Sequence, residues 1–592
     1  MMRAPVPASS DRLLTNAIVL ASDGIELVGD LYIPAGKPPF PAILQVTPDN
    51  ARSLAGLGRI YALRGYLFLA LDCRGRYRSA GEWEPLVHEQ EDGHAAIAWL
   101  AEHTLCNRRV GMRGHGYSGY NQLLAAIDAP EALQAIVVTG AQGDPFLNAP
   151  FVGGAYDTSN LVKLLDRVGR VGCEESPDEN FDKRRFGGGS ISTNLYEDTA
   201  PATPTKEIGG DWPVLDAFRT TQPFAQIDRR LGTLQPQFRE WIRHWRIDDY
   251  WRARSVGEGI NRIKAPALLM SGWWDSNSRG ATAFFDGLRK AGQDKLRLLI
   301  GPWNDALEAP DCSALPEVDA SAIERAAKRD DLNDEFAWFD RHLRDLPAGP
   351  TTVARTTLFL TGLNCWLDFD DWPPSGTRQS ALYLHANGAL HPVAPDVVAA
   401  SSVYRFDPAD PTPYGPPSYR GDPVPFDTKD LAEGRDDILV FETPPLPAPL
   451  ALVGEVSVLL HAEADAPDFD LCVKLLDRHP DGRTIVLCDG VLRARFRDGW
   501  EQPTPVEPGQ VSAYRIDLWH LGHVFRSGHA VRLEIASGAL GRIDINPCTG
   551  GDLASDTDRR VAKIRLHHAK TYPSHLLLPI CDDPRLVDET SA

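Results

Sequence analysis

The chain has 592 residues and a formal net charge of −20, with 43% hydrophobic and 24% charged residues. This composition is ordinary for a globular protein, and the length predicts several domains because one hydrophobic core rarely organises so long a chain. The acidic balance and the lack of clustered Lys and Arg exclude nucleic acid or an anionic membrane as the main partner.

Nine cysteines occur singly, without a C-x-x-C pair, which predicts reduced thiols rather than a disulfide framework or a zinc site. With neither a signal peptide nor an apolar run long enough to span a bilayer, we expect a cytoplasmic protein.

The first 145 residues alternate strand and helix signals. The runs 42–46 and 67–72 are almost wholly apolar, which is typical of strands buried on both faces of a mainly parallel sheet. Helical spacing at 54–64 lies between them. Further strands are expected at 17–21, 26–33, 109–114 and 135–139, and further helices at 92–102 and 122–127. This order predicts a doubly wound α/β domain.

Two breaks in this pattern predict the domain organisation. The segment 146–261 is rich in Trp, Arg and Asp, with a glycine-rich loop at 187–189, and it interrupts the alternation as a helical cap over an α/β active site would. The alternation resumes at 262–347, and short strand-like segments with Pro, Gly and Asp turns follow at 348–592. We therefore expect an α/β domain in two parts, 1–145 and 262–347, a cap at 146–261, and a C-terminal all-β jelly-roll domain at 348–592.

Short motifs run in order along nearly the whole chain: DCRGR at 72–76, VGMRG at 110–114, SGWWD at 271–275, GPW at 301–303, DGVLR at 489–493, FRSGH at 525–529 and NPCTG at 546–550. Together they resemble the cocaine esterase and X-Pro dipeptidyl-peptidase (CocE/NonD) family of serine hydrolases. The resemblance implies an α/β-hydrolase fold with a helical cap and a C-terminal jelly roll. It also implies a Ser–His–Asp triad, with the serine on a strained strand-to-helix turn, and a tyrosine hydroxyl that stabilises the oxyanion.

The triad of the family is degenerate in this chain. An ungapped match across the elbow GHGYSGY at 114–120 puts Gly116 at the position of the nucleophile, and the backbone N–H of Tyr117 would then face the site. Asp275 falls on the triad aspartate, and Asp305 takes the place of the histidine. Because the nucleophile and the base are both missing, the sequence argues against hydrolysis through an acyl-enzyme.

An acid also takes the place of the oxyanion tyrosine. Asp49 holds that position, or Asn50 does if the loop is shifted by one residue. A charged Asp49 would repel an oxyanion. If the loops converge as the family fold implies, Asp49, Asp275 and Asp305 share one cavity, and at least one of these carboxyl groups has a raised pKa. Three carboxylates are also a donor set for a hard cation, but their spacing matches no known metal-binding loop, so we expect no metal.

These residues predict a non-hydrolytic, cofactor-independent enzyme that uses Asp305 and Asp275, with Asp49 and His115, for proton transfer in a lyase, isomerase or cyclase reaction. His115 is either a relocated base or a packed elbow residue. The acidic cavity favours a small, amine-containing metabolite, and specialised metabolism would suit such a reaction. Two alternatives stay open: an inactive small-molecule binding protein, and an ester or amide hydrolase with Ser118 as nucleophile, which requires a two-residue shift of the elbow.

Other residues have a structural and a functional interpretation. The cap aromatics either line the pocket or pack the cap; they include Trp212, Trp241, Trp245 and Trp251. Arg493, Arg495 and His529 are expected to be structural and to hold the jelly-roll domain against the catalytic domain. We expect a small-molecule substrate and no cofactor. A homodimer is an open alternative, because relatives of this type are often dimers.

Overall fold

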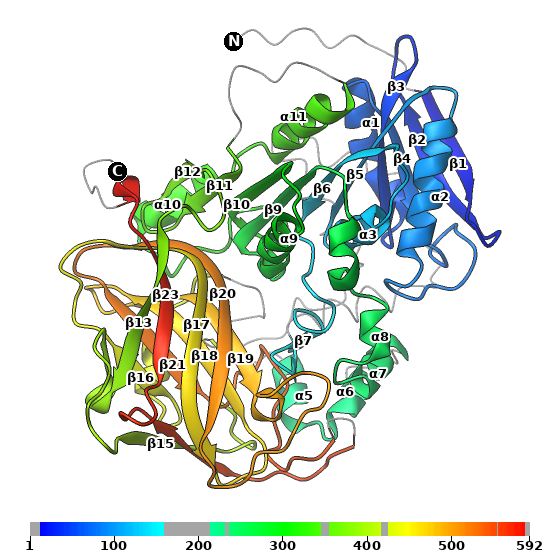
Figure 1. The fold of residues 1–592 in the computed structure, drawn as a ribbon. Coiled ribbons are helices and arrows are strands. Elements are labelled where there is room, and N and C mark those ends of the chain that lie inside the picture. Colours follow the sequence, from blue (N-terminus) through cyan, green and yellow to red (C-terminus); the bar gives the residue numbers. More distant parts are fainter. Residues whose placement is uncertain are drawn as a thin grey trace.

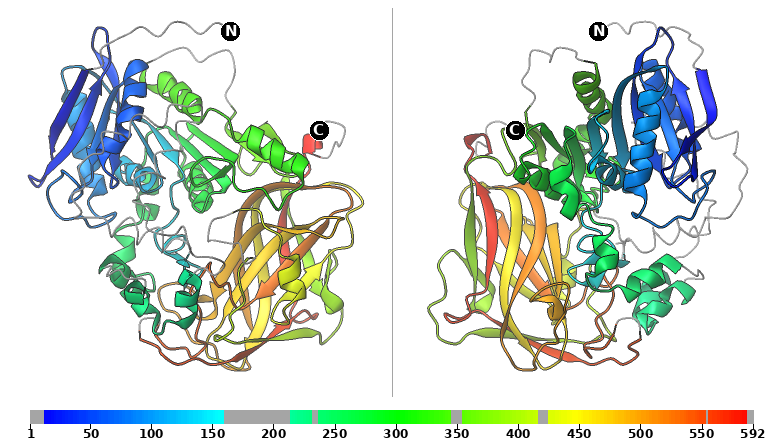
Figure 2. Two further views of the ribbon diagram at one scale, coloured as in Figure 1. Left: turned by 180° about the vertical axis from the view of Figure 1, so that it is seen from behind. Right: turned by 45° about the vertical axis from the view of Figure 1, so that its right-hand side comes forward.

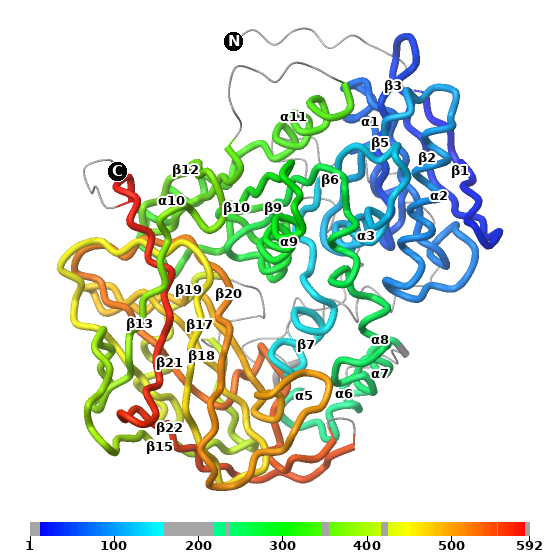
Figure 3. The backbone as a smooth tube through the Cα atoms, viewed as in Figure 1, coloured from blue at the N-terminus to red at the C-terminus, as the bar shows by residue number. Residues whose placement is uncertain are grey.

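The computed structural model describes residues 12–158, 213–230, 236–344, 354–415, 424–552 and 555–586. The chain forms a mixed α/β domain, a small group of helices beneath it, and a large β-rich domain beside both (Figure 1). The two further views agree on this arrangement (Figure 2). The tube trace in Figure 3 shows the chain leaving the α/β domain towards β7 and returning from α8 to β9.

A ten-stranded sheet forms the centre of the α/β domain. Its strand order is β1-β2-β4-β3-β5-β6-β9-β10-β11-β12, and all neighbours from β4 to β11 are parallel. The central strands are buried along almost their whole length because helices cover both faces, as their apolar sequences predicted. The strands are β1 (Arg12–Leu20), β2 (Glu26–Ile33), β3 (Phe40–Thr47), β4 (Leu67–Asp72), β5 (Cys106–His115), β6 (Leu133–Thr139), β9 (Ala267–Trp274), β10 (Leu296–Asn304), β11 (Thr356–Leu360) and β12 (Cys365–Phe369).

Helices pack on the two faces of this sheet in separate clusters. One face carries α1 and α11, whose Tyr61, Phe336 and Phe339 pack on strand residues that include Phe68. The other face carries α2, α3 and α9. The helices of the domain are α1 (Ala55–Leu63), α2 (Glu89–Glu102), α3 (Tyr117–Ala126), α9 (Ser278–Lys290), α10 (Glu317–Ala326) and α11 (Asp331–Leu343).

The sheet continues beyond residue 347, where we expected the α/β domain to end. β11 pairs in parallel with β10, and β12 turns back antiparallel to β11. Residue burial explains the difference: β11 is buried at every position, so it completes the sheet core before the chain enters the second domain. A short run such as TTLFL gives no sign in the sequence of which sheet it will join.

The described part of the inserted segment begins with a hairpin of two strands, β7 (Phe151–Val152) and β8 (Ala155–Tyr156). Short helices follow, namely α5 (Pro213–Thr220), α6 (Ile227–Arg230), α7 (Pro236–Arg243) and α8 (Asp249–Arg252). The glycine-rich loop at 187–189 and Trp212 lie outside the described residues. Trp241 and Trp251 are buried with Phe146 and Phe151 in one cluster, and Trp245 packs against that cluster. These three tryptophans therefore pack the inserted segment.

The C-terminal domain is the expected jelly roll, with a small helix, α12 (Lys429–Glu433). Long antiparallel strands alternate more and less buried positions, as β17 does from Glu455 to Ala464. The strands are β13 (Thr377–His385), β14 (Ala389–His391), β15 (Ser401–Phe406), β16 (Leu439–Glu442), β17 (Leu450–Ala464), β18 (Asp470–Arg478), β19 (Thr484–Arg493), β20 (Ser512–Phe525), β21 (Ala530–Ala536), β22 (Ala562–His567) and β23 (His575–Cys581).

Two buried arginines form ion pairs within the jelly roll, whereas we expected them to hold this domain against the catalytic one. Arg493 donates to Asp470 at 2.9 Å and to Asp544 at 3.1 Å, and Arg495 donates to Asp468 at 2.7 Å. Each guanidinium donates hydrogen bonds to an aspartate carboxylate, and a buried charge requires such a partner. Among the helices of the described ranges, none combines the length and the apolar composition needed to cross a bilayer.

Candidate functional site

The turn from β5 into α3 is a strained elbow at Gly116. Gly116 has φ 56° and ψ −120°, a left-handed conformation that glycine adopts at little cost. Its N–H donates to the Thr139 carbonyl at 3.0 Å, and its carbonyl accepts from the Tyr120 N–H at 3.0 Å. The helix therefore starts at Tyr117, five residues before the expected start at 122, because the elbow itself begins it.

Ser118 packs inside the elbow. It is 4% exposed, and a Cβ placed on Gly114 would stand 2.8 Å from the Ser118 Cβ and 2.3 Å from its carbonyl oxygen. β5 and α3 therefore approach so closely that position 114 has no room for a side chain. Ser118 is buried where the backbone of α3 meets β5.

The tip of the elbow is open. In the part of the chain that the structure describes, no atom other than those of Gly116 and its two neighbours lies within 4 Å of the point where a Cβ on Gly116 would stand. The next N–H, that of Tyr117, belongs to the first turn of α3, where N–H groups have no partner within the helix. The Tyr117 side chain points to the opposite side, where its hydroxyl donates to Glu89 and accepts from the Leu86 N–H at 3.0 Å. Burial raises the pKa of Glu89 to about 7.

Asp275 and Asp305 follow β9 and β10 and lie in contact. The Asp275 carboxylate accepts from the Ser271 hydroxyl at 2.5 Å and from the Asn277 N–H at 2.8 Å. Asp305 accepts from the N–H of Ser276 at 2.7 Å and from its hydroxyl at 2.9 Å. Burial, and then the charge of Asp305, raise the pKa of Asp275 well above its ordinary range. Asp275 is 2% exposed whereas Asp305 is half-buried, so burial favours the protonated form of Asp275 in this pair.

His115 joins this pair at the end of β5. A Cβ placed on Gly140 would stand 3.0 Å from an Asp275 carboxylate oxygen, 3.0 Å from the His115 Cε1 and 3.2 Å from its Nε2. The imidazole and the buried carboxyl group therefore lie against the same residue. The structure thus brings His115, Asp275 and Asp305 together beside the elbow, since β5, β6, β9 and β10 are adjacent parallel strands.

Asp49 occupies the loop after β3, in the unshifted register. Asn50 is not available for the site, because its side chain caps the 3-10 turn Ala51–Leu54 by accepting from the Arg52 N–H at 3.1 Å. Asp49 is half-buried, and no hydrogen bond to its carboxylate is found in the described ranges. Burial, the charge of Glu89 and the charge of Asp49, in this order, raise the pKa of the Cys73 thiol. The Asp49 carboxylate therefore lies near Cys73, in the loop after β4.

Arg76 is a residue of this region to which the sequence analysis gave no role. It is 2% exposed, donates from Nε to the Pro48 carbonyl at 2.8 Å, and stacks on Trp83 with its guanidinium carbon 4.6 Å from the ring centre. It thereby fixes the loop that carries Asp49. Its place in the DCRGR motif was the available signal, but only the fold shows which carbonyl it binds.

The raised pKa of Asp275 predicts a specific pH dependence of stability. The folded protein retains a proton that the unfolded chain releases above a pH of about 4. The free energy of unfolding should therefore fall as the pH rises from about 4 to beyond neutrality. Asp275→Asn removes this proton, so the variant should lose less stability than the native chain between pH 5 and pH 9. Thermal unfolding at both pH values measures this, with the exposed Asp294→Asn as control. An equal loss in Asp275→Asn and native protein would contradict the shared proton.

Comparison with known proteins identifies the family. Residues 23–305 match the family model of X-Pro dipeptidyl-peptidase (S15 family), and residues 343–577 match that of the X-Pro dipeptidyl-peptidase C-terminal non-catalytic domain. Cocaine esterase from Rhodococcus sp. (strain MB1 Bresler) is 29% identical over 96% of this chain and 98% of the relative. Two solved structures, an aminopeptidase from a Thaumarchaeota archaeon and an α-amino acid ester hydrolase, superpose with a TM-score of 0.80 at 22% and 23% identity, each covering 98% of both chains.

These matches overturn the expectation of a non-hydrolytic lyase, isomerase or cyclase. Both matching family models are of X-Pro dipeptidyl-peptidases, and the curated relative is an esterase, so the family is one of hydrolytic enzymes. The expectation was wrong because it equated the loss of the serine and the histidine with the loss of hydrolysis. The chain belongs to the cocaine esterase and X-Pro dipeptidyl-peptidase (CocE/NonD) family of α/β-hydrolase-fold enzymes.

Proposed function

We propose that this chain hydrolyses an ester or amide bond of a small molecule, with water as the attacking group in place of a serine hydroxyl. The family supports the reaction type, since the S15 family model spans the elbow and both aspartates. The residues at the elbow support the change of nucleophile, since Gly116 has no side chain and Ser118 packs against Gly114.

The open tip of the elbow carries the proposal. Apart from Gly116 and its two neighbours, no atom of the described residues lies within 4 Å of a Cβ position on Gly116, so a water molecule fits where a serine side chain would otherwise stand. The Asp275–Asp305 pair follows the neighbouring strands and contains a carboxylate and a carboxylic acid. Two carboxyl groups with separated pKa values are a general way to run acid and base chemistry at one site.

The proposed reaction proceeds in two steps. In the first, the Asp305 carboxylate takes a proton from water while the water oxygen forms a bond to the carbonyl carbon. The carbonyl oxygen becomes an oxyanion, and the Tyr117 N–H in the first turn of α3 donates to it. In the second, the bond to the leaving alcohol or amine breaks, and the leaving group takes a proton from the carboxyl pair. The pair then has the protonation state with which it began.

The charge of the site points to a substrate that carries an ammonium group. Asp49 is a half-buried acid on the loop that the buried Arg76 fixes, and Asp305 adds a second carboxylate. An ammonium group near the scissile bond would pair with Asp49, which removes the repulsion between this acid and the oxyanion. Esters of α-amino acids have this chemistry, and one structural neighbour is a hydrolase of such esters.

A matched pair of substrates tests this proposal. We expect a higher kcat/KM for an α-amino acid ester than for the corresponding ester without the amine. Asp49→Asn should raise KM for the amino ester by about tenfold, the factor for a charge contact of about 1.4 kcal/mol, and leave the neutral ester unaffected. Steady-state kinetics with both esters measures this, with Asp294→Asn as control. An equal change for both esters would contradict the role of Asp49, and the absence of turnover with either would contradict hydrolysis.

A further inference from the structure

A second cluster of titratable side chains lies in the jelly-roll domain, where it meets the α/β domain. Asp477 is near the end of β18, His479 follows this strand, and His529 precedes β21. The strands are antiparallel neighbours that pair Arg478 with Ala530, so residue 479 comes next to residue 529. Three donor side chains separated by up to fifty residues in sequence therefore meet at one end of the sheet.

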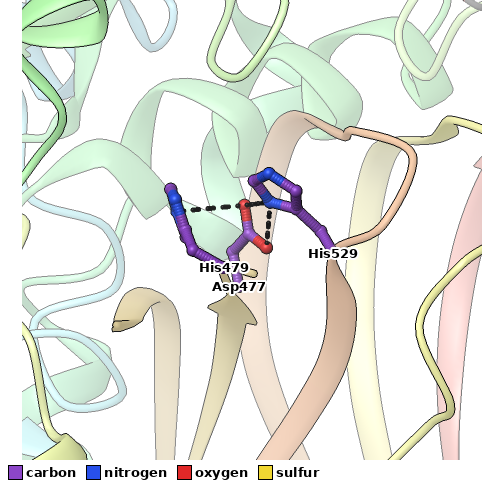
Figure 4. Close-up of side chains that lie close together, drawn as sticks. All are labelled: Asp477, His479 and His529. Atoms are coloured by element: carbon purple, nitrogen blue, oxygen red, sulfur yellow. Dashed lines mark hydrogen bonds and ion pairs between the residues drawn. The ribbon is translucent and has the colours of Figure 1, made fainter. Parts of the chain in front are cut away.

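The donor atoms of these three residues face one another. The His529 Nδ1 atom lies 2.8 Å and 3.0 Å from the two carboxylate oxygens of Asp477. The His479 Nε2 atom lies 3.5 Å from the Asp477 Oδ2 atom. All three ligand atoms lie within 4.8 Å of one another. Figure 4 shows the Asp477 carboxylate between the two imidazoles. Ligands of a tetrahedral Zn²⁺ ion at about 2.0–2.1 Å stand about 3.3 Å apart, so this spacing suits one ion.

The cluster lines a cavity between the two domains. The cavity encloses about 710 Å³ of empty space, part of it open to solvent, and its walls include Trp273, Trp274 and Ile323 from the α/β domain. All three donor residues are less than 10% exposed. A site with three protein ligands and a neighbouring cavity leaves a coordination position for water or a ligand, as in zinc sites that are not purely structural.

A neighbouring side chain holds the central ligand in place. One further imidazole orients the carboxylate: His523 lies with Nε2 3.2 Å from Asp477 and Nδ1 2.8 Å from the Thr361 hydroxyl. Such partners of the ligands are typical of protein metal sites.

We propose that Asp477, His479 and His529 bind one divalent transition-metal ion of the Zn²⁺ type in the cavity between the two domains, with His523 as a positioning residue for Asp477. This site is separate from the elbow and from the proposed hydrolysis. It differs from our expectation from the sequence, which considered only the three acids of the elbow region and assigned His529 a structural role. Two imidazoles and one carboxylate are a donor set that Zn²⁺ accepts, whereas a hard cation such as Ca²⁺ prefers oxygen ligands.

Zinc titration of the full-length protein tests the proposal. Protein stripped with a chelator should take up one equivalent of Zn²⁺, measured by calorimetry or by competition with a chromophoric chelator. His479→Gln should weaken binding by at least about 100-fold, and His523→Gln by about 10- to 100-fold. His520→Gln is the matched control, because His520 lines the same cavity but bonds the Thr282 hydroxyl at 2.9 Å.

Two further measurements make the result decisive. Anomalous diffraction at the zinc edge should place the ion between Asp477 and the two imidazoles, and thermal unfolding should show that every variant is folded. Stoichiometric binding that is lost in His479→Gln and retained in His520→Gln supports the site. No stoichiometric binding by the native protein, or equal binding by native protein and His479→Gln, would show that the cluster is a hydrogen-bonded network only.

Discussion

Replacing Asp305 with Asn will lower kcat/KM for ester hydrolysis by about 10²- to 10⁴-fold, the range that general-base catalysis contributes. Asp305 is the less buried member of the carboxyl pair, and Ser276 holds it with two hydrogen bonds. An amide keeps the acceptor oxygen for one of these bonds but cannot take a proton from water. Initial rates with an amino acid ester, compared with native protein, measure the effect.

The control for this variant removes an acid of the same type elsewhere. Asp294 is exposed and precedes β10, so Asp294→Asn should leave kcat/KM within twofold of the native value, as expected for a surface change. Thermal unfolding should show that Asp305→Asn is folded. Full activity in a folded Asp305→Asn protein would contradict the role of Asp305 and leave the attack on the carbonyl without a base.

The double variant Gly116→Ser with Asp305→His will react covalently with a fluorophosphonate at position 116. Gly116 has the backbone conformation of a nucleophile elbow, and apart from its two neighbours no atom of the described residues lies within 4 Å of its Cβ position. Asp275 is the residue that the family motifs align with the triad aspartate. The two changes therefore rebuild a Ser–His–Asp triad on an existing scaffold, and intact-mass spectrometry with peptide mapping detects the adduct.

The single variants separate the contributions to this reaction. Gly116→Ser alone should be labelled far more slowly, because its hydroxyl lacks a histidine to take the proton. Gly116→Ala should not be labelled at all, and its strain at φ 56° should be similar to that of Gly116→Ser, which makes it the control for folding. A folded double variant that stays unlabelled would show that position 116 is not at the nucleophile position of the elbow.

Much of the fold could be predicted from the sequence because local patterns were strong. The strands 26–33 and 67–72 are confirmed at both ends, and each is bounded by residues that break the pattern. The family motifs predicted the order of the α/β domain and the jelly roll. The end of the first sheet was not predictable, because β11 pairs with β10 and β12 pairs with β11 through backbone contacts that their short sequences do not specify.

The sequence predicted positions for the candidate site but not its contacts. Alignment to the family motifs predicted Gly116, Asp275 and Asp305 as site residues, and these follow β5, β9 and β10 of one sheet. The packing of Ser118 against Gly114 depends on the distance between α3 and β5, and the cap made by Asn50 depends on a positive φ of 65°. Both are properties of the folded backbone.

The cluster of Asp477, His479 and His529 had no signal in the sequence. Its residues lie at the adjoining ends of two strands, and they meet only because β18 and β21 pair with one specific register. A shift of one residue would turn His479 to the other face of the sheet. Long-range registers of this kind carry no local pattern, which is why His529 was expected only to hold the jelly-roll domain against the catalytic one.

Ester turnover in the presence of a fluorophosphonate tests most directly whether water replaces the serine nucleophile. We predict that the native protein hydrolyses an amino acid ester at the same rate before and after exposure to an excess of the reagent, and that its intact mass does not change. Loss of turnover together with a phosphonyl adduct on Ser118 would contradict the proposed mechanism and return the protein to hydrolysis through an acyl-enzyme.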